Sequence, residues 1–398
     1  MRVRVAHIVP TDRIAFFLLS TRLGQLREAG YEVTVICGEV AYADELRARG
    51  IEVVHIPFAR EIEPYTDLRC AWALYRVLRR RRHQIVHSHN PKGGLLGPVV
   101  AALARIGRRR TTAIVHTVHG FLFNDETPWL RRIVAIAAER WTAAWCDHLL
   151  FQSSEDLDYA RAWRFKRSAS LHLIGNGIDQ SRFDPRRWPH ARARKREELG
   201  WEESHLVVGM VGRLVVEKGF PEYFAMAGEL ARRLEQVRFL VVGITESDQR
   251  DALDPHQLCR NHGIEERTVI LEQRHDMPEL YTSMDVAVLP SHREGIPRAI
   301  MEASAMGVPV VATDIRGCRE VIVHRQTGLL FRVGDVEAFA AVVEELLLDT
   351  ALRRRLGAAG SRRVFGYYTE DRTAARLMDI YDRLLGNDEG SSQTARVG

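Results

Sequence analysis

The segment LVVGMVGRLVVEKGF, residues 206–220, decides the fold. Its first seven residues, 206–212, form an apolar run that predicts a buried strand, and Lys218-Gly219 stands before a stretch with helical periodicity. Strand, short loop and helix in this order are the repeating unit of a parallel sheet covered by helices.

The same unit recurs along most of the chain. Short runs rich in Val, Ile and Leu, separated by helix-like segments such as 21–29, lie at 3–9, 32–37, 51–56, 84–89, 113–119 and 148–152, and again at 206–212, 238–243, 268–271, 285–290 and 309–313. The sequence therefore predicts an α/β protein with two doubly wound, Rossmann-like parallel sheets in tandem.

The junction between the two sheets is predicted near residue 190. The segment 182–196 is rich in Pro, Arg and polar residues and has the composition of a linker. We expect a first domain at 1–190 and a second at 191–370. A helix at 371–385 is expected to pack back toward the first domain, and a polar tail at 386–398 is expected to be flexible.

Composition is that of an ordinary globular chain, with 398 residues, 46% hydrophobic and 27% charged. No apolar run reaches the ~20 residues that a membrane span needs, and the start lacks the pattern of a secretory signal, so we expect a cytoplasmic protein. Five scattered cysteines with no C-x-x-C pair indicate reduced packing residues and no zinc site.

Charge is unevenly distributed. Residues 1–200 carry a net charge of +12 and the remainder −7, and the segment 68–124 holds eleven basic residues and no acidic one. A solvated surface, an anionic membrane or a phosphorylated substrate would each explain this excess. Nucleic acid is not favoured, because no nucleic-acid-binding motif occurs and aromatic residues do not alternate with the arginines.

Ligands of such sheets bind at the carboxyl ends of the strands, so two facing sheets predict a cleft lined by strand-to-helix loops. In the loop after 206–212, Gly212 permits close approach of a ligand to the backbone. Arg213 and Lys218 place two cations beside a helix N-terminus, which suits a diphosphate. The alternative is an ordinary pair of surface cations.

A second loop carries two carboxylates. After the strand at 285–290, the sequence SHREGIPRAIME places Glu294 before a helix that is predicted to begin at Pro297, and Glu302 in its second turn. Free backbone amides near Gly295 form an anion site, and ionised carboxylates can each accept two hydrogen bonds from a vicinal diol. The alternative is a helix N-terminal charge and a solvated helix residue.

These motifs together resemble the family 4 retaining glycosyltransferases of GT-B fold. The second half carries GRLVVEKG, the E-x7-E pair Glu294 and Glu302, and TGLLF. The first half carries PFAREIEPYTDL, IVHSHNPKGGLLG, TVHGFLF and IGNGID, which resemble bacterial members that build glycans on polyprenyl diphosphate carriers. The resemblance covers the chain to about residue 385.

The resemblance implies roles for the donor-binding residues. Arg213 and Lys218 would neutralise the leaving diphosphate, Glu302 would hold the nucleoside ribose, and Glu294 would hold the sugar hydroxyls. Backbone groups of Gly295, Ile296 and Pro297 would assist, Pro297 only through its carbonyl.

His119, at the end of a first-domain strand, matches the family histidine near the anomeric centre and would position and polarise there. His87, His89 and His116 are expected to be packed residues. Retention in the family is explained by front-face attack, so no protein nucleophile is predicted. We expect no metal and no cofactor, and UDP is favoured over GDP only as the commoner nucleotide.

One departure from the family is the sequence PTDRIAF at 10–16, where many relatives carry a Gly-Gly loop. It leaves open how the first domain closes on its ligands. Asn90, Lys92 and Gly93 open a helix and are predicted to meet the acceptor diphosphate. Arginines in two clusters are predicted to meet lipid headgroups on the inner face of the membrane: Arg79, Arg80, Arg81, Arg82, Arg108, Arg109 and Arg110.

Three functions compete at this stage. They are transfer of a hexose from a nucleotide sugar to a lipid-linked glycan in polysaccharide biosynthesis, transfer to a soluble small molecule or protein, and epimerisation of a nucleotide sugar by the same fold. The basic first half favours the lipid-linked acceptor. The E-x7-E pair with Arg213 and Lys218 favours transfer.

Overall fold

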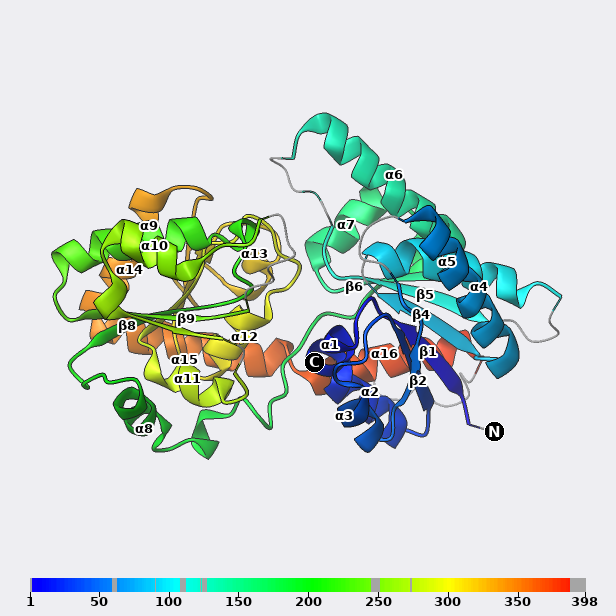
Figure 1. The fold of residues 1–398 in the computed structure, drawn as a ribbon, viewed down its shortest axis with the longest axis horizontal. Helices are drawn as coiled ribbons and strands as arrows, with labels where there is room; N and C mark the ends of the chain where they lie inside the picture. The colour runs from blue at the N-terminus through cyan, green and yellow to red at the C-terminus, as the bar shows by residue number, and fades with distance from the viewer. Residues whose placement is uncertain are drawn as a thin grey trace, which may run out of the picture. The chain divides into compact units, whose positions relative to one another are not determined.

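The chain folds into two compact units in the computed structural model (Figure 1). The structure describes residues 2–58, 63–89, 91–107, 112–121, 123, 127–244, 251–272 and 274–386, and only the backbone at 91–93. Unit 1 comprises Met1–Gly175 with Glu370–Gly398, and unit 2 comprises Asn176–Thr369.

Unit 1 is built on a parallel sheet of seven strands in the order β3-β2-β1-β4-β5-β6-β7. The strands are β1 (Arg4–Ile8), β2 (Glu32–Cys37), β3 (Glu52–His55), β4 (Ile85–His89), β5 (Ala113–Val118), β6 (His148–Phe151) and β7 (Leu171–Leu173).

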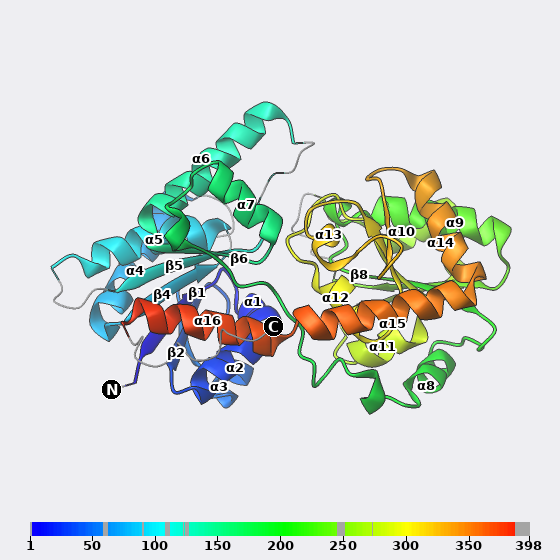
Figure 2. The same ribbon diagram turned by 180° about the vertical axis from the view of Figure 1, so that it is seen from behind.

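Helices cover both faces of this sheet (Figures 1 and 2). One apolar core lies under α4 (Pro64–Arg81), α5 (Pro91–Arg105), α6 (Trp129–Trp145) and α7 (Ser154–Ala162). The core of the other face lies under α1 (Asp12–Ile14), α2 (Ser20–Glu28), α3 (Ala43–Ala48) and α16 (Glu370–Leu384).

Unit 2 repeats the design with a six-stranded parallel sheet in the order β10-β9-β8-β11-β12-β13. Its strands are β8 (Leu206–Val211), β9 (Val237–Val242), β10 (Thr268–Leu271), β11 (Val286–Leu289), β12 (Val310–Thr313) and β13 (Leu329–Phe331). Its helices are α8 (Ala191–Glu198), α9 (Phe220–Arg233), α10 (Pro255–His262), α11 (Met277–Ser283), α12 (Arg298–Ala305), α13 (Cys318–Val321), α14 (Val336–Leu348) and α15 (Thr350–Tyr367).

Both sheets are doubly wound, as the sequence predicted, and each contains a point where the strand order reverses. In unit 1 this point lies between β1 and β4, and in unit 2 between β8 and β11. Loops diverge to opposite faces there and leave a crevice at the carboxyl ends of the strands. The two loops singled out in the second half follow β8 and β11, so the fold brings them to the same crevice.

The division between the units lies after Gly175, earlier than the boundary expected near residue 190. The reason is that Ile178 and Phe183 are buried in the core of unit 2. The expected linker at 182–196 is also packed, because Arg196 is 2% exposed and bonds to Asp285 at 2.7 Å. At least one of the arginines that suggested a linker, Arg196, therefore serves as a buried ion-pair partner.

The segment that replaces the Gly-Gly loop enters a helix almost directly after β1. Helix α1 begins at Asp12, continues through a π-helical turn at Ala15–Leu19, and runs on into α2. Asp12 is fully buried, and one of its carboxylate oxygens accepts a hydrogen bond from the Tyr42 amide at 2.5 Å. The chain turns here without a glycine.

Helix α16 carries the end of the described chain back onto unit 1. The buried side chains of Arg22 and Glu370 form an ion pair at 3.1 Å, and Tyr31 donates to Asp382 at 2.8 Å. Leu377, Ile380 and Tyr381 are buried in the core beneath it. Of the tail expected to be flexible, residues 387–398 lie outside the described residues.

We expect Arg22→Leu to lower the free energy of unfolding by about 3 kcal/mol or more, because it removes the cation that pairs with the buried Glu370 carboxylate. The double variant Arg22→Leu/Glu370→Leu should recover most of this loss. Urea unfolding measures both, with Arg383→Leu as the control because its pair with Asp379 is exposed. Equal losses for Arg22→Leu and Arg383→Leu would contradict a tethering role for the buried pair.

Candidate functional site

The crevice at the carboxyl ends of β8 and β11 contains the charged residues expected to bind a ligand. Arg213 is exposed, directly after the end of β8, and Lys218 lies at the end of a short 3-10 turn before α9. Glu294 lies in the loop after β11. Cations and carboxylates thus come from both sides of the strand reversal.

Lys218 and Glu294 join the two loops directly. The Lys218 Nζ lies 2.5 Å from Glu294 Oε1, and Ser291 Oγ donates to the same oxygen at 2.8 Å. Thr313, at the end of β12, donates to the Ser291 carbonyl at 2.5 Å. Glu294 is only 8% exposed. Its carboxylate is held by the Lys218 ammonium of the β8 loop and by the Ser291 hydroxyl of the β11 loop.

Glu302 occupies the second turn of α12. Its Oε2 accepts a hydrogen bond from the Tyr281 hydroxyl at 3.2 Å, and its Oε1 lies 3.3 Å from Arg298 Nε. The carboxylate is 13% exposed, so it retains a small accessible surface. It is not the solvated helix residue of the alternative interpretation.

Helix α12 begins one residue later than predicted. Pro297 is extended, with φ −73° and ψ 120°, and occupies the N-cap position, so Arg298 is the first helical residue. The amides of Gly295 and Ile296 precede the helix and belong to the loop. Pro297 still contributes its carbonyl, which accepts from the Met301 amide at 3.4 Å.

Two glycines beside the crevice, Gly219 and Gly317, are required by their protein neighbours, whereas the ligand approach predicted at Gly212 stays a prediction. A Cβ on Gly212 would meet nothing closer than 4.0 Å, so its backbone is not forced to be glycine by its neighbours. Gly219, with φ +80°, would place a Cβ 2.0 Å from the Pro290 carbonyl oxygen. Gly317, with φ +46°, would place one 1.6 Å from the Gly295 carbonyl oxygen. The absence of a side chain at Gly219 lets the β8 loop approach the backbone of Pro290, and the absence of one at Gly317 lets the loop after β12 approach the backbone of Gly295.

One positioning residue of the β11 loop was not predicted from the sequence. The buried Asn176 donates from Nδ2 to the Ile296 carbonyl oxygen at 3.2 Å. Its signal is the IGNGID segment, which the sequence offered only as part of a family resemblance. Asn176 supports the loop from a segment 120 residues away in the sequence.

In unit 1, His119 ends a chain of hydrogen-bonded histidines under the α16 face of the sheet. Its Nε2 lies 3.1 Å from His89 Nδ1, and His89 Nε2 lies 3.0 Å from His7 Nδ1. His87 lies between Thr117 Oγ1, at 2.6 Å, and the Tyr381 hydroxyl, at 2.5 Å. The prediction that His87 and His89 are packed residues was therefore incomplete, since they form an ordered polar layer.

These imidazoles are held neutral. Burial lowers the pKa of His7 and of His119 to about 3, and the positive charge of Arg22 acts in the same direction. Burial lowers the pKa of His116 to about 4, and it lowers the pKa of His87 and His89 well below the ordinary value. A neutral imidazole carries one N–H, so the chain couples the tautomer of His119 to those of His89 and His7.

The histidine layer also offers nitrogen atoms that could hold a metal ion. One nitrogen each of His7, His87 and His89 lies within 4.8 Å of the others. Ligands of tetrahedral zinc, at about 2.0–2.1 Å from the metal, lie only about 3.4 Å apart. Both nitrogens of His87 already have hydroxyl partners, so the geometry fits a hydrogen-bonded layer better than a metal site.

The residues predicted to bind the acceptor cannot be compared with the structure. Asn90 lies outside the described residues, and at the start of α5 only the backbone of Lys92 and Gly93 is described. Arg108, Arg109 and Arg110 also lie outside the described residues. Their roles stay predictions.

Two of the four arginines at the end of α4 are engaged within unit 1. The Arg79 guanidinium donates to the carbonyls of Ala104, at 3.1 Å, and Ile106, at 2.7 Å, and so caps the end of α5. Arg81 forms an ion pair with Glu52. Arg79, Arg80 and Arg82 are exposed and Arg81 is partly buried, and the role of these arginines at lipid headgroups stays a prediction.

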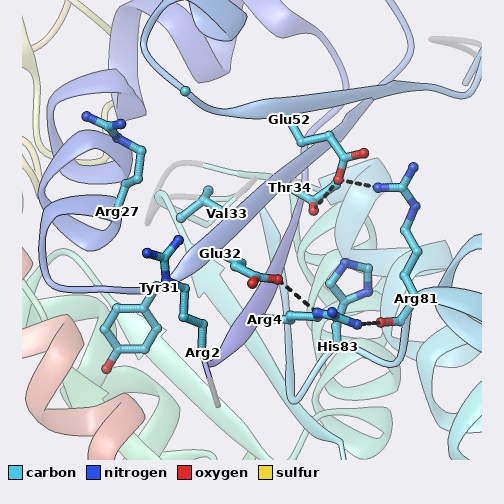
Figure 3. A pocket seen from close by; sticks show the side chains of 11 residues that line it. Arg2, Arg4, Arg27, Tyr31, Glu32, Val33, Thr34, Glu52, Arg81 and His83 are labelled. Carbon is cyan, nitrogen blue, oxygen red and sulfur yellow. Dashed lines mark hydrogen bonds and ion pairs between the residues drawn. The ribbon is translucent and has the colours of Figure 1, made fainter.

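Arg81 also lines a cavity of about 490 Å³ at the amino ends of β1, β2 and β3 (Figure 3). Arg4 pairs with Glu32 at 2.8 Å, and Thr34 donates to Glu52 at 3.0 Å. Burial acts to raise the pKa of Glu52, but hydrogen bonds from Arg81 and Thr34 outweigh it and lower that pKa. This cavity lies at the amino ends of the unit 1 strands, opposite the carboxyl ends of β1 and β4, and contains none of the residues predicted to bind the donor.

Two family models match the chain and together cover most of it. The model described as Glycosyl transferases group 1 matches residues 191–363, and the model described as Glycosyltransferase Family 4 matches residues 22–182. The first match contains the β8 and β11 loops, and the second contains the histidine layer except His7.

Individual proteins are similar over nearly the whole chain. The UDP-Gal:alpha-D-GlcNAc-diphosphoundecaprenol alpha-1,3-galactosyltransferase of Escherichia coli is 27% identical over 90% of each chain. The N,N'-diacetylbacillosaminyl-diphospho-undecaprenol alpha-1,3-N-acetylgalactosaminyltransferase of Campylobacter jejuni is 25% identical over 91% of this chain and 94% of its own. The structure of Anabaena Alr3699/HepE in complex with UDP-glucose has a TM-score of 0.79 at 19% identity, covering 96% of this chain and 100% of its own.

The buried histidines of unit 1 predict a loss of stability in acid. The unfolded chain takes up a proton on His116 below about pH 6.5, whereas the folded protein resists until its pKa of about 4. Stability is therefore highest above pH 6.5 and falls as the pH decreases, by about 1.4 kcal/mol per pH unit for one imidazole.

Urea unfolding at about pH 7.5 and about pH 5 checks this, and His116→Gln should lose roughly 2 kcal/mol less between them than the wild type. His256→Gln is the control, because His256 is exposed and should behave as the wild type. The same acid sensitivity in His116→Gln and the wild type would refute the neutral state of His116.

Proposed function

Because this chain belongs to the family 4 glycosyltransferases, we propose that it transfers a sugar from a nucleotide sugar to a glycan acceptor held on a lipid diphosphate. The observation that carries the proposal is the strand reversal crevice of unit 2, where Lys218 of the β8 loop pairs with Glu294 of the β11 loop, and Glu302 follows in α12. Its mixture of cations and carboxylates suits a ligand with both phosphates and hydroxyls.

Arg213 and Lys218 serve the donor diphosphate in this proposal. Breaking the bond to the sugar increases the negative charge on the diphosphate, so cations already in place stabilise the transition state more than the ground state. Lys218 is held within the crevice by Glu294. We propose that these cations, with the Gly295 and Ile296 amides, carry out this role without a metal ion.

Glu302 and Glu294 serve the hydroxyls. A carboxylate oxygen can accept more than one hydrogen bond, so the contacts from Tyr281 and Arg298 leave Glu302 able to accept from a ribose diol. Glu294 Oε1 is bonded to Lys218 and Ser291, and Oε2 has no hydrogen bond within the described parts of the chain. That oxygen is offered to the hydroxyls of the transferred sugar.

His119 is proposed to act near the sugar as a neutral hydrogen-bonding group. Its low pKa argues against a general acid at neutral pH. Its Nε2 faces His89, so the tautomer of His119 depends on the chain that leads to His7. We infer retention of anomeric configuration by front-face attack, as in the family, with no protein nucleophile.

The names of the relatives support the choice of substrates. Two of them act on acceptors linked to undecaprenyl diphosphate, one of these uses UDP-galactose, and the Anabaena structure holds UDP-glucose. We therefore favour a UDP-sugar donor and a lipid-linked acceptor over a soluble acceptor or an epimerase reaction. The protein would act beside the membrane that holds its acceptor.

A panel of nucleotide sugars tests the proposal. The full chain should consume one or more UDP-sugars, release UDP, and extend a polyprenyl-diphosphate-linked sugar. Added chelator should leave the rate unchanged. Extension of soluble acceptors alone would favour transfer to a soluble small molecule or protein. If no nucleotide sugar is consumed, the proposed glycosyltransferase activity is refuted.

Glu302→Gln keeps the shape of the side chain and removes its charge, so binding of UDP should weaken by about 10- to 100-fold, as expected for hydrogen bonds to a charged group. Calorimetric titration measures the affinity. Glu344→Gln is the matched control, because Glu344 lies on α14 and pairs with Arg233 at the end of α9, away from the β8 and β11 loops. Unchanged UDP affinity in Glu302→Gln would refute its role at the ribose.

A further inference from the structure

Helix α6 of unit 1 turns an apolar face toward solvent. Leu130 is 60% exposed, Ile133 54%, Val134 63% and Trp141 55%. Ala137 and Ala144 are exposed as well. Surface helices of globular proteins ordinarily present polar residues at such positions, so this face requires an explanation.

These six residues form one continuous stripe. At 3.6 residues per turn they fall within about 100° of arc along the helix. The opposite side of α6 packs into the core of unit 1 through Ile136 and Ala143. We call this surface the α6 stripe; it consists of residues 130, 133, 134, 137, 141 and 144. None of the six belongs to the buried core of unit 1, so packing of the core does not explain why they are apolar.

The neighbouring helices extend the apolar surface. Helix α6 packs on α5, and α5 packs on α4, so the three form one layer on the sheet (Figure 1). Of the 17 large hydrophobic residues that are exposed in the described parts of the chain, ten lie in this region: Tyr65, Leu68, Trp72, Leu103, Ile106, Trp129, Leu130, Ile133, Val134 and Trp141. Unit 2 contributes only three of the 17.

The charge of this layer is strongly positive. Helices α4, α5 and α6 contain ten basic residues and two acidic ones. Arg131 and Arg140 lie on the two sides of the α6 stripe, by the same helical geometry. Both are exposed, and Arg140 also donates to the Trp163 carbonyl at 3.0 Å.

We propose that the α6 stripe docks unit 1 on an anionic phospholipid bilayer, with α6 lying in the plane of the interface. Tryptophan and branched apolar residues flanked by arginines are the composition of interfacial helices. Within the described residues no helix is long and apolar enough to cross a bilayer. The docking of α6 extends the proposed function, because it gives the enzyme access to a lipid-linked acceptor.

The docking surface differs from the one that the arginine clusters suggested. Attraction of arginines alone is screened by salt, whereas insertion of an apolar stripe is not. The two sources of binding can therefore be separated in one experiment. A second copy of the chain is the other candidate occupant, and light scattering of the same variants detects it.

The test is flotation of the full chain with vesicles of phosphatidylcholine, with and without phosphatidylglycerol, at low and high salt. Wild type should bind the anionic vesicles and keep part of this binding at high salt. Ile133→Gln/Trp141→Gln should bind at least about tenfold more weakly, because it places two polar groups in the stripe. Leu348→Gln is the matched control, since Leu348 is 61% exposed but lies in unit 2.

Equal vesicle binding by the wild type and the double variant would overturn the proposal, and so would the absence of binding by the wild type. A wild-type dimer in light scattering that becomes a monomer in Ile133→Gln/Trp141→Gln would assign the stripe to a second copy instead. UDP affinity of the double variant should equal that of the wild type. Since vesicle binding and UDP affinity are separate readouts, failure of the docking surface is distinguishable from failure of the proposed function.

Discussion

The reversal of strand order between β8 and β11 is the constraint on which the site of unit 2 depends. Because the connections leave these neighbouring strands toward opposite faces of the sheet, their loops open a crevice rather than cover it. The Lys218–Glu294 ion pair joins the loops, and Gly219 and Gly317 let backbone approach where any Cβ would collide. The positions of the Lys218 and Glu294 charges therefore follow from the strand order of the sheet and from the two close backbone contacts at Gly219 and Gly317.

Much of this could be predicted from the sequence, because apolar runs and helical periods report burial directly. The predicted strand at 268–271 has the observed bounds, and the doubly wound class follows from the alternation of strands and helices. The short strand β13 and the packing of Arg196 could not be predicted, since a three-residue strand has no periodicity and a buried arginine depends on its distant partner Asp285. The same limit hid Asn176, whose partner lies 120 residues away.

Two larger features of unit 1 were also hidden in the sequence, for different reasons. The histidines at 7, 87, 89 and 119 come from three parts of the chain and form a layer only when β1, β4 and β5 are neighbours. The α6 stripe is visible as a helical period, but periodicity cannot tell which side of a helix faces the core. Both features lie in the unit expected to bind the acceptor.

The most direct measurement of the central claim is the structure of the full chain with UDP bound. The account predicts that the diphosphate lies against Arg213 and Lys218 at the carboxyl ends of β8 and β11, and that the ribose hydroxyls donate to Glu302. Nucleotide bound at any other place, with the Lys218–Glu294 loops empty, would contradict it.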